Sequence, residues 1–209
     1  MKTTLLVAAL AGAALSSSAL AGTAYFAGNI TTASSTFVNP GGSTSGSGIH
    51  FFDVIQFTVD LTGTYVIESA SPNTGGTNSN ALDTYLRLYA NTFNPAAPTG
   101  ALASNDDFTG ALTVLPGPYA GTVLPASTGF AGAEPASRIS TTLTAGVTYF
   151  LINTSFRQTN YVDTSLNGKQ IGAYYTGISG GGNITLVPTP GAMGALAMGG
   201  LLASRRRRA

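Results

Sequence analysis

The residues with the clearest capacity for chemistry are three consecutive oxygen-bearing side chains, Asn105, Asp106 and Asp107. Hard cations such as calcium take several oxygen ligands, and carboxylates together with an asparagine carbonyl and backbone oxygens would supply them. The alternative role is structural, because Asn and Asp side chains also cap turns through hydrogen bonds to nearby backbone groups. The sequence leaves a calcium site and a capped turn both open.

Other reactive residue types are scarce. The chain has no cysteine, which excludes disulfides, thiolate catalysis and cysteine-based zinc sites. His50 is the single histidine, and a Ser-His-Asp hydrolase would need it beside both an acid and a nucleophile. A glycosidase needs two carboxylates with separate roles across a cleft, whereas Asp106 and Asp107 are adjacent in sequence. We therefore expect no catalytic residues, with a secreted hydrolase acting on polysaccharide as the alternative.

The charges are few and unevenly placed. Charged residues make up 8% of the chain, and Lys2 with Arg205–Arg208 puts most of the positive charge at the two ends. Between the ends, four basic residues stand against eight acidic ones, a net charge of −4. Nucleic-acid binding depends on clustered Lys and Arg facing phosphates. We expect no nucleic-acid partner.

The N-terminus has the pattern of a cleavable signal peptide. Lys2 precedes an apolar run from Leu5 to Leu15, and Ala19 and Ala21 form an A-x-A site before Gly22. The apolar run is too short to span a bilayer. We expect signal peptidase to remove residues 1–21 and the mature chain to begin near Gly22, outside the cytoplasmic membrane.

The C-terminus combines a proline pair, an apolar run over residues 191–203 and the arginines 205–208. As a helix, this run would span about 20 Å, against a hydrocarbon core of about 30 Å. The arginines that follow it would stay on the cytoplasmic side. The segment therefore suits transient membrane insertion during export better than permanent anchoring.

This end of the chain resembles the PEP-CTERM sorting signal of exopolysaccharide-producing bacteria. The matching residues are Val187, Pro188, Thr189, Pro190, the apolar run, and Arg205, Arg206, Arg207 and Arg208. Thr189 stands where the family has Glu, so the match is to a PTP variant. The resemblance implies that residues 188–209 are a sorting tail processed by an exosortase-like enzyme, a membrane cysteine protease-transpeptidase. A simple tail anchor that stays in place is the alternative.

The body between the two ends predicts an all-β fold. Short runs rich in Val, Ile, Phe, Tyr and Thr are separated by turn residues, which favours a β-sandwich or barrel. The expected strands cover residues 51–59, 64–69, 84–89, 147–153, 171–178 and 183–187. We expect the first two to pair as a hairpin, and the fourth to be buried on both faces.

Three further expectations concern this body. The strand over residues 84–89 should place Tyr85 and Arg87 on one face and Leu86 and Leu88 on the other. Asn167-Gly168 is a two-residue hairpin signal. Residues 22–48 form a Ser/Thr/Gly-rich lead-in, in which Phe37 and Val38 could form a short edge strand, and residues 112–137 form a long proline-containing loop that is either functional or a tolerated insertion.

Four ordered pieces of the body resemble bacterial pre-peptidase C-terminal (PPC-like) domains. They are FDVIQF with a following Thr-Gly turn, LDTYLRLY, LASNDD, and SRI with LTAGVTYF, within residues 50–153. The resemblance implies a jelly-roll-like antiparallel β-sandwich over residues 49–187, usually an accessory module without catalysis. It also implies that Asp83 lies close to Asn105, Asp106 and Asp107, where some relatives bind calcium. An ion pair between Asp83 and Arg138 is a further expectation.

Together these features predict an exported, non-catalytic β-sandwich protein with an N-terminal signal helix and a short C-terminal hydrophobic helix. We expect it at the cell surface, in the outer envelope or in an exopolysaccharide matrix, as an adhesion, carbohydrate-binding or structural module. Tyr161, Tyr174 and Tyr175 would either stack on sugars or pack within the sheets. An envelope structural protein with no specific ligand is the remaining alternative.

Overall fold

The computed structural model describes residues 22–39, 48–71, 82–108, 110–115, 136–159 and 170–187. Within these ranges the chain forms β-strands and no helix. The expected signal peptide, the sorting tail from Pro188 onwards and the Asn167-Gly168 turn lie outside the described residues.

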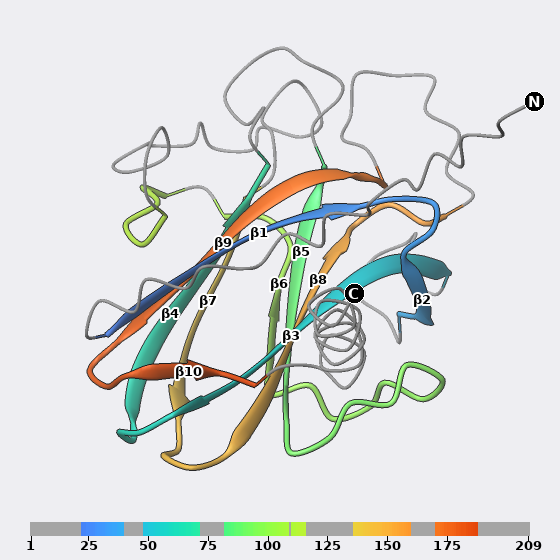
Figure 1. Cartoon of the computed structure of the whole chain (residues 1–209). Coiled ribbons are helices and arrows are strands. Elements are labelled where there is room, and N and C mark those ends of the chain that lie inside the picture. The colour runs from blue at the N-terminus through green and yellow to red at the C-terminus, as the bar shows by residue number, and fades with distance from the viewer. Residues whose placement is uncertain are drawn as a thin grey trace, which may run out of the picture.

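The strands form two antiparallel sheets, which lie against each other in Figure 1. The four-stranded sheet has the order β1-β9-β4-β7, and the six-stranded sheet has the order β10-β3-β8-β5-β6 with β2 paired to β3. The bounds are β1 Thr23–Ile30, β2 Ser35–Val38, β3 Ile49–Val59, β4 Gly63–Ala70, β5 Thr84–Ala90, β6 Ala103–Asn105, β7 Ser137–Leu143, β8 Thr148–Ser155, β9 Gly172–Gly180 and β10 Ile184–Leu186. The all-β class is confirmed, and the arrangement is β-sandwich-like.

The main core lies between the sheets and draws on alternate residues of their strands. Tyr65 and Ile67 of β4 pack in the same cluster as Leu86 and Leu88 of β5 and Leu151 of β8. The predicted alternation of residues 84–89 is thus confirmed. The opposite face of β5 is also buried, because an aromatic cluster around Phe37, Phe52, Tyr89 and Ile152 covers the outer side of the six-stranded sheet. β8 is buried on both faces for the same reason, because its Leu151 packs in the main core and its Ile152 in the aromatic cluster.

The predicted hairpin over residues 51–69 is wrong. β3 pairs with β8, β2 and β10, whereas β4 pairs with β7 and β9 in the other sheet. The turn after Val59 therefore carries the chain from one sheet to the other. Both strands present apolar residues to a common core, and that local pattern is the same whether neighbours in sequence pair directly or face each other across a sandwich.

The segment expected as a lead-in, residues 22–48, contributes two strands to the sandwich. β1 is an edge strand of the four-stranded sheet, paired with β9, and its Ala24 and Phe26 belong to the main core. The boundary at residue 48 therefore separates no unit within the described part. β2 confirms the short edge strand expected at Phe37 and Val38.

Candidate functional site

Strand register brings three acidic residues together at one end of the six-stranded sheet. Asp83 directly precedes β5, and Asp106 and Asp107 directly follow β6. Because β5 and β6 are antiparallel, with Leu86 opposite Asn105, the start of one strand lies beside the end of the other. The three carboxylates each offer an oxygen within 4.8 Å of the others.

The three carboxylates differ in burial. The Asp83 side chain is only 7% exposed, Asp107 is exposed, and Asp106 is intermediate. One oxygen of Asp106, Oδ1, is buried and has no hydrogen-bond partner among the described residues. A buried acceptor without a partner is costly, so this oxygen is the strongest sign that the cluster is incomplete by itself.

Burial and mutual repulsion disfavour ionisation of this cluster. Desolvation raises the pKa of Asp83 to about 7, an effect that the nearby Arg157 opposes. Desolvation, together with the charges of Asp83 and Asp107, raises the pKa of Asp106 to about 8. A proton or a cation bound among these oxygens would relieve both effects.

The cation beside the cluster is Arg157, not Arg138. Arg157 follows β8 and its Nε lies 3.2 Å from Asp83 Oδ2. The expected pair between Asp83 and Arg138 is therefore wrong. Arg138 stands directly opposite Glu68 in the register of β7 and β4, and its Nη1 lies 3.5 Å from Glu68 Oε1. Three carboxylates facing one guanidinium leave an excess of negative charge when all are ionised.

Asn105 has a structural role beside the aspartates. Its Oδ1 accepts a hydrogen bond from the backbone N–H of Arg138 at 2.8 Å, and its Nδ2 donates to the Asp107 carbonyl at 3.3 Å. The hydroxyl of Ser137 lies 2.7 Å from the Asp106 carbonyl. These contacts hold the turn that carries Asp106 and Asp107, as the capping alternative predicts for Asn105.

His50 lies in a structural rather than a catalytic setting. It is fully buried, its Nδ1 lies 2.9 Å from the Ser155 carbonyl, and its Nε2 has no partner among the described residues. Burial lowers its pKa. The chain also contains one G-x-S-x-G segment, Gly177–Gly181. Its Ser179 lies within β9, where its hydroxyl accepts a hydrogen bond from the Thr23 hydroxyl. The nucleophile of a hydrolase with this motif lies instead on a strand-to-helix turn.

Glu68 is a buried anion that the sequence did not single out. Its carboxylate accepts hydrogen bonds from the backbone N–H groups of Thr113, Val114 and Leu115, at 2.8–3.2 Å. These contacts fasten the start of the 112–137 loop over the four-stranded sheet. The only signal in the sequence is a lone glutamate within a strand of a chain that has few charges.

The remaining predicted residues divide between described and undescribed parts. Tyr174 is buried, Tyr175 is 40% exposed, and Tyr161 lies outside the described residues. Gly22 and Val187 are the first and last described residues. Ala19, Ala21, Pro188, Thr189, Pro190 and Arg205–Arg208 lie outside the described part. In the part of the chain that is described, no helix has the length and apolar character needed to cross a membrane.

Comparison with protein-family models finds no match for this chain, and no curated protein matches it either.

Proposed function

We propose that this is an exported, non-catalytic protein of the cell surface or of an extracellular polysaccharide matrix, with a calcium ion bound at Asp83, Asp106 and Asp107. The observation that carries the calcium site is that Asp83, Asp106 and Asp107 each offer an oxygen within 4.8 Å of the others, and that one oxygen of Asp106 is buried without a partner among the described residues. Export rests on the signal-peptide pattern of residues 1–21 and on the sorting-tail pattern of residues 188–209.

The donor set suits calcium better than a softer metal. All three side chains offer carboxylate oxygens, and neither the single histidine nor any cysteine belongs to the cluster. Calcium takes oxygen ligands in flexible geometry, whereas zinc and copper favour imidazole and thiolate. A divalent cation would also balance the negative charge that Arg157 alone leaves uncompensated.

A calcium titration followed by thermal melting tests the site. A ligand that binds only the folded state stabilises it, by about 2.7 kcal/mol at a hundred times its dissociation constant. For a domain of this size we expect the melting temperature to rise by about 5–10 °C. Asp106→Asn should abolish the rise, whereas Asp60→Asn, an equivalent change at an exposed acid hydrogen-bonded to Asn183, should leave it intact.

An unchanged melting temperature of the wild-type protein at millimolar calcium would refute the calcium site. An equal rise with magnesium would show a less selective divalent site, since magnesium demands stricter octahedral geometry.

Mass spectrometry of the protein recovered from the cell surface tests the export proposal. We expect an N-terminus at Gly22 and a C-terminus that lacks Arg205–Arg208. A surface form that retains the arginines would contradict sorting with cleavage and would favour the tail anchor. Polysaccharide hydrolysis by the purified protein that disappears in Asp106→Ala would contradict the non-catalytic assignment.

A further inference from the structure

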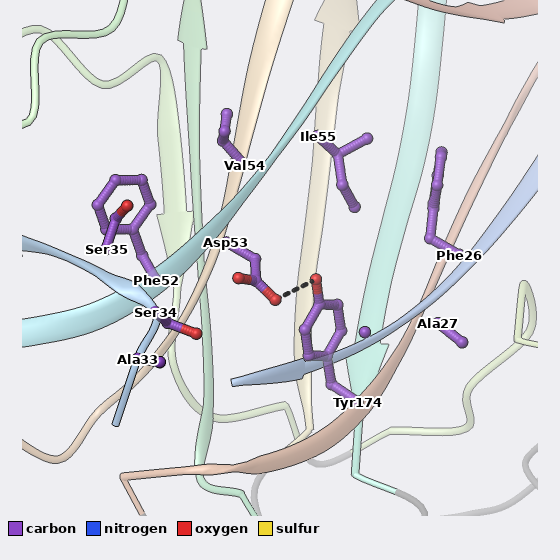
Figure 2. Close-up of a pocket in the computed structure, with 11 residues that line it drawn as sticks. Phe26, Ala27, Ala33, Ser34, Ser35, Phe52, Asp53, Val54, Ile55 and Tyr174 are labelled. Atoms are coloured by element: carbon purple, nitrogen blue, oxygen red, sulfur yellow. Dashed lines mark hydrogen bonds between the residues drawn. The ribbon is translucent and has the colours of Figure 1, made fainter. Parts of the chain in front are cut away.

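A cavity of about 490 Å³ opens on the side of the sandwich, between β1 of one sheet and β3 of the other. Figure 2 shows Asp53 and Tyr174 meeting in this cavity, with Phe26 and Ile55 beside them. Ser34 of the β1–β2 turn and Ser35, the first residue of β2, lie at the opposite side. None of its lining residues belongs to the acidic cluster. Its volume falls within the range of roughly 300–1,000 Å³ that is typical of small-molecule sites.

The cavity exists because both sheets are open at this point. β1 is an edge strand. On the outer edge of β3, the pairing with β2 ends at Phe52 and the pairing with β10 begins at Phe57. Between these two paired stretches, the carbonyl of Gln56 points to the same outer edge and accepts a hydrogen bond from the backbone N–H of Val187. Alternation along the strand places the peptide N–H and C=O of Val54 on the same edge, where no described strand pairs with them.

Gly28 gives Tyr174 its position in the cavity. The two residues are directly opposite in the register of β1 and β9. A Cβ at Gly28 would lie 2.3 Å from the Tyr174 ring, so any side chain there would displace the ring. The glycine therefore lets the ring lie across β1 and direct its hydroxyl to Asp53, which it reaches at 3.1 Å from Oδ2.

The described residues that line the cavity supply hydrogen-bond donors and acceptors but no positive charge. The Tyr174 hydroxyl donates to Oδ2 of Asp53, and no other hydrogen bond joins this carboxylate to a described residue. The hydroxyls of Ser34 and Ser35 lie at the rim, and Ser34 already accepts one hydrogen bond from Thr31. Among the described lining residues, Asp53 carries the only carboxyl group, and none is Lys, Arg or His. The Asp53 carboxylate would repel an anionic ligand.

We propose that this cavity binds one neutral pyranose residue of a polysaccharide, through the Asp53 carboxylate and the apolar wall formed by Phe26 and Ile55. A pyranose ring offers hydroxyls that donate and accept around its rim and apolar C–H groups on its faces. Oδ1 of Asp53 would accept from a hydroxyl, and the serine hydroxyls and the Val54 peptide would both donate and accept. An ammonium group would use only the acceptors and would leave these donors unpaired.

This inference rests on the proposed location in a polysaccharide matrix but not on the calcium site. The two fail separately: a calcium-insensitive melting temperature leaves the cavity untouched, and a protein that binds no sugar can still bind calcium. Sugar binding is therefore measured both in calcium and in EGTA.

The experiment is a titration of the purified, isotopically labelled protein with the methyl pyranosides of glucose, galactose and mannose, followed by NMR. A binding free energy of about −0.3 kcal/mol per non-hydrogen atom, as drug-sized ligands show, gives a dissociation constant on the order of 1 mM for a methyl pyranoside. We expect at least one sugar to produce saturable shifts that are confined to residues 26–28, 33–35, 52–55 and 174. Asp53→Asn should weaken that binding at least tenfold, and Asp60→Asn should not change it.

Several outcomes would overturn the inference. These are the absence of saturable shifts with all three sugars at 100 times the expected dissociation constant of about 1 mM, shifts centred elsewhere in the molecule, or unchanged affinity in Asp53→Asn. Binding of methylammonium without binding of any pyranoside would assign the cavity to cations instead. If Asp53→Asn does not fold, the location of the wild-type shifts and the loss of binding in Ser35→Trp, which fills the rim, decide the question.

Discussion

The acidic cluster predicts that the protein loses stability as the pH rises, which is the reverse of the usual effect of aspartates on stability. Asp83 and Asp106 have folded-state pKa values of about 7 and about 8, above the ordinary aspartate value of 3.8. Between pH 4 and pH 8 the folded protein therefore holds protons that the unfolded chain has released. Stability from this source is fully present below pH 4, declines as the pH rises above 4, and is lost once the pH has passed the folded pKa values of about 7 and about 8. Without calcium, raising the pH should destabilise the protein.

The magnitude follows from proton linkage. Each proton that the folded state holds and the unfolded state does not changes the free energy of unfolding by about 1.4 kcal/mol per pH unit. For a domain of this size, about 1 kcal/mol corresponds to about 2–4 °C in melting temperature. Asp106→Asn removes one of these titrating groups, so the slope of the free energy of unfolding against pH should fall by the contribution of about one proton. In EGTA, the wild type should lose about 1.4 kcal/mol more stability than the variant for each pH unit between pH 5 and pH 8, so that the variant is the more stable protein at pH 8.

Calcium should reverse that order. The ion needs ionised carboxylates, so its binding strengthens as the pH rises, and it stabilises the wild type but not Asp106→Asn. The assay is urea unfolding, followed by circular dichroism from pH 5 to pH 8, in EGTA and in calcium. His50 and Asp53 also titrate with shifted pKa values, but both proteins contain them, so the difference between the two curves isolates Asp106. Parallel curves in EGTA for wild type and variant would refute the argument.

Three further predictions concern residues outside this cluster. Glu68→Ala should reduce the free energy of unfolding by about 2–4 kcal/mol in urea titrations, because three backbone N–H groups would lose a buried charged acceptor; a loss below about 0.5 kcal/mol would show that water replaces the carboxylate. His50 has a lowered pKa, so its contribution to stability should be present above pH 6.5 and be lost as the pH falls below it; His50→Gln should flatten the curve there, and an unchanged slope would contradict a buried neutral imidazole. Gly28→Ala should cost about 1–3 kcal/mol through its clash with the Tyr174 ring, whereas Tyr174→Phe should cost only about 1 kcal/mol by removing the hydrogen bond to Asp53; equal stability of Gly28→Ala and wild type would show that the ring moves freely.

Several features of the fold could be predicted from local sequence. The alternation of Leu86 and Leu88 with Tyr85 and Arg87 identifies a strand and its inward face, because side chains of a strand point alternately to its two sides. The apolar run that becomes β8 indicates a strand buried on both faces for the same reason. Asn105 as a turn-capping residue is likewise a local property, since its partners include a backbone group two residues away.

Pairing between strands required the tertiary structure. β3 and β4 are neighbours in sequence but lie in different sheets, because a strand's own pattern specifies a buried face and not the strand beside it. The same holds for the charges. Arg157 reaches Asp83 because β8 ends beside the start of β5, and Arg138 reaches Glu68 because β7 pairs with β4. Strand register is a long-range property, and it determines that Arg157 lies beside Asp83 and Arg138 beside Glu68.

The two candidate sites show the same division. The sequence by itself identified Asp106 and Asp107 as possible ligands, because the two acids are adjacent in the chain. Only the tertiary structure showed that Asp106 has a buried oxygen with no partner among the described residues, and that Asp53 meets Tyr174 in a cavity between two open sheet edges. Residues 53 and 174 are far apart in the chain, and their contact depends on how the sheets pack, which no local pattern encodes.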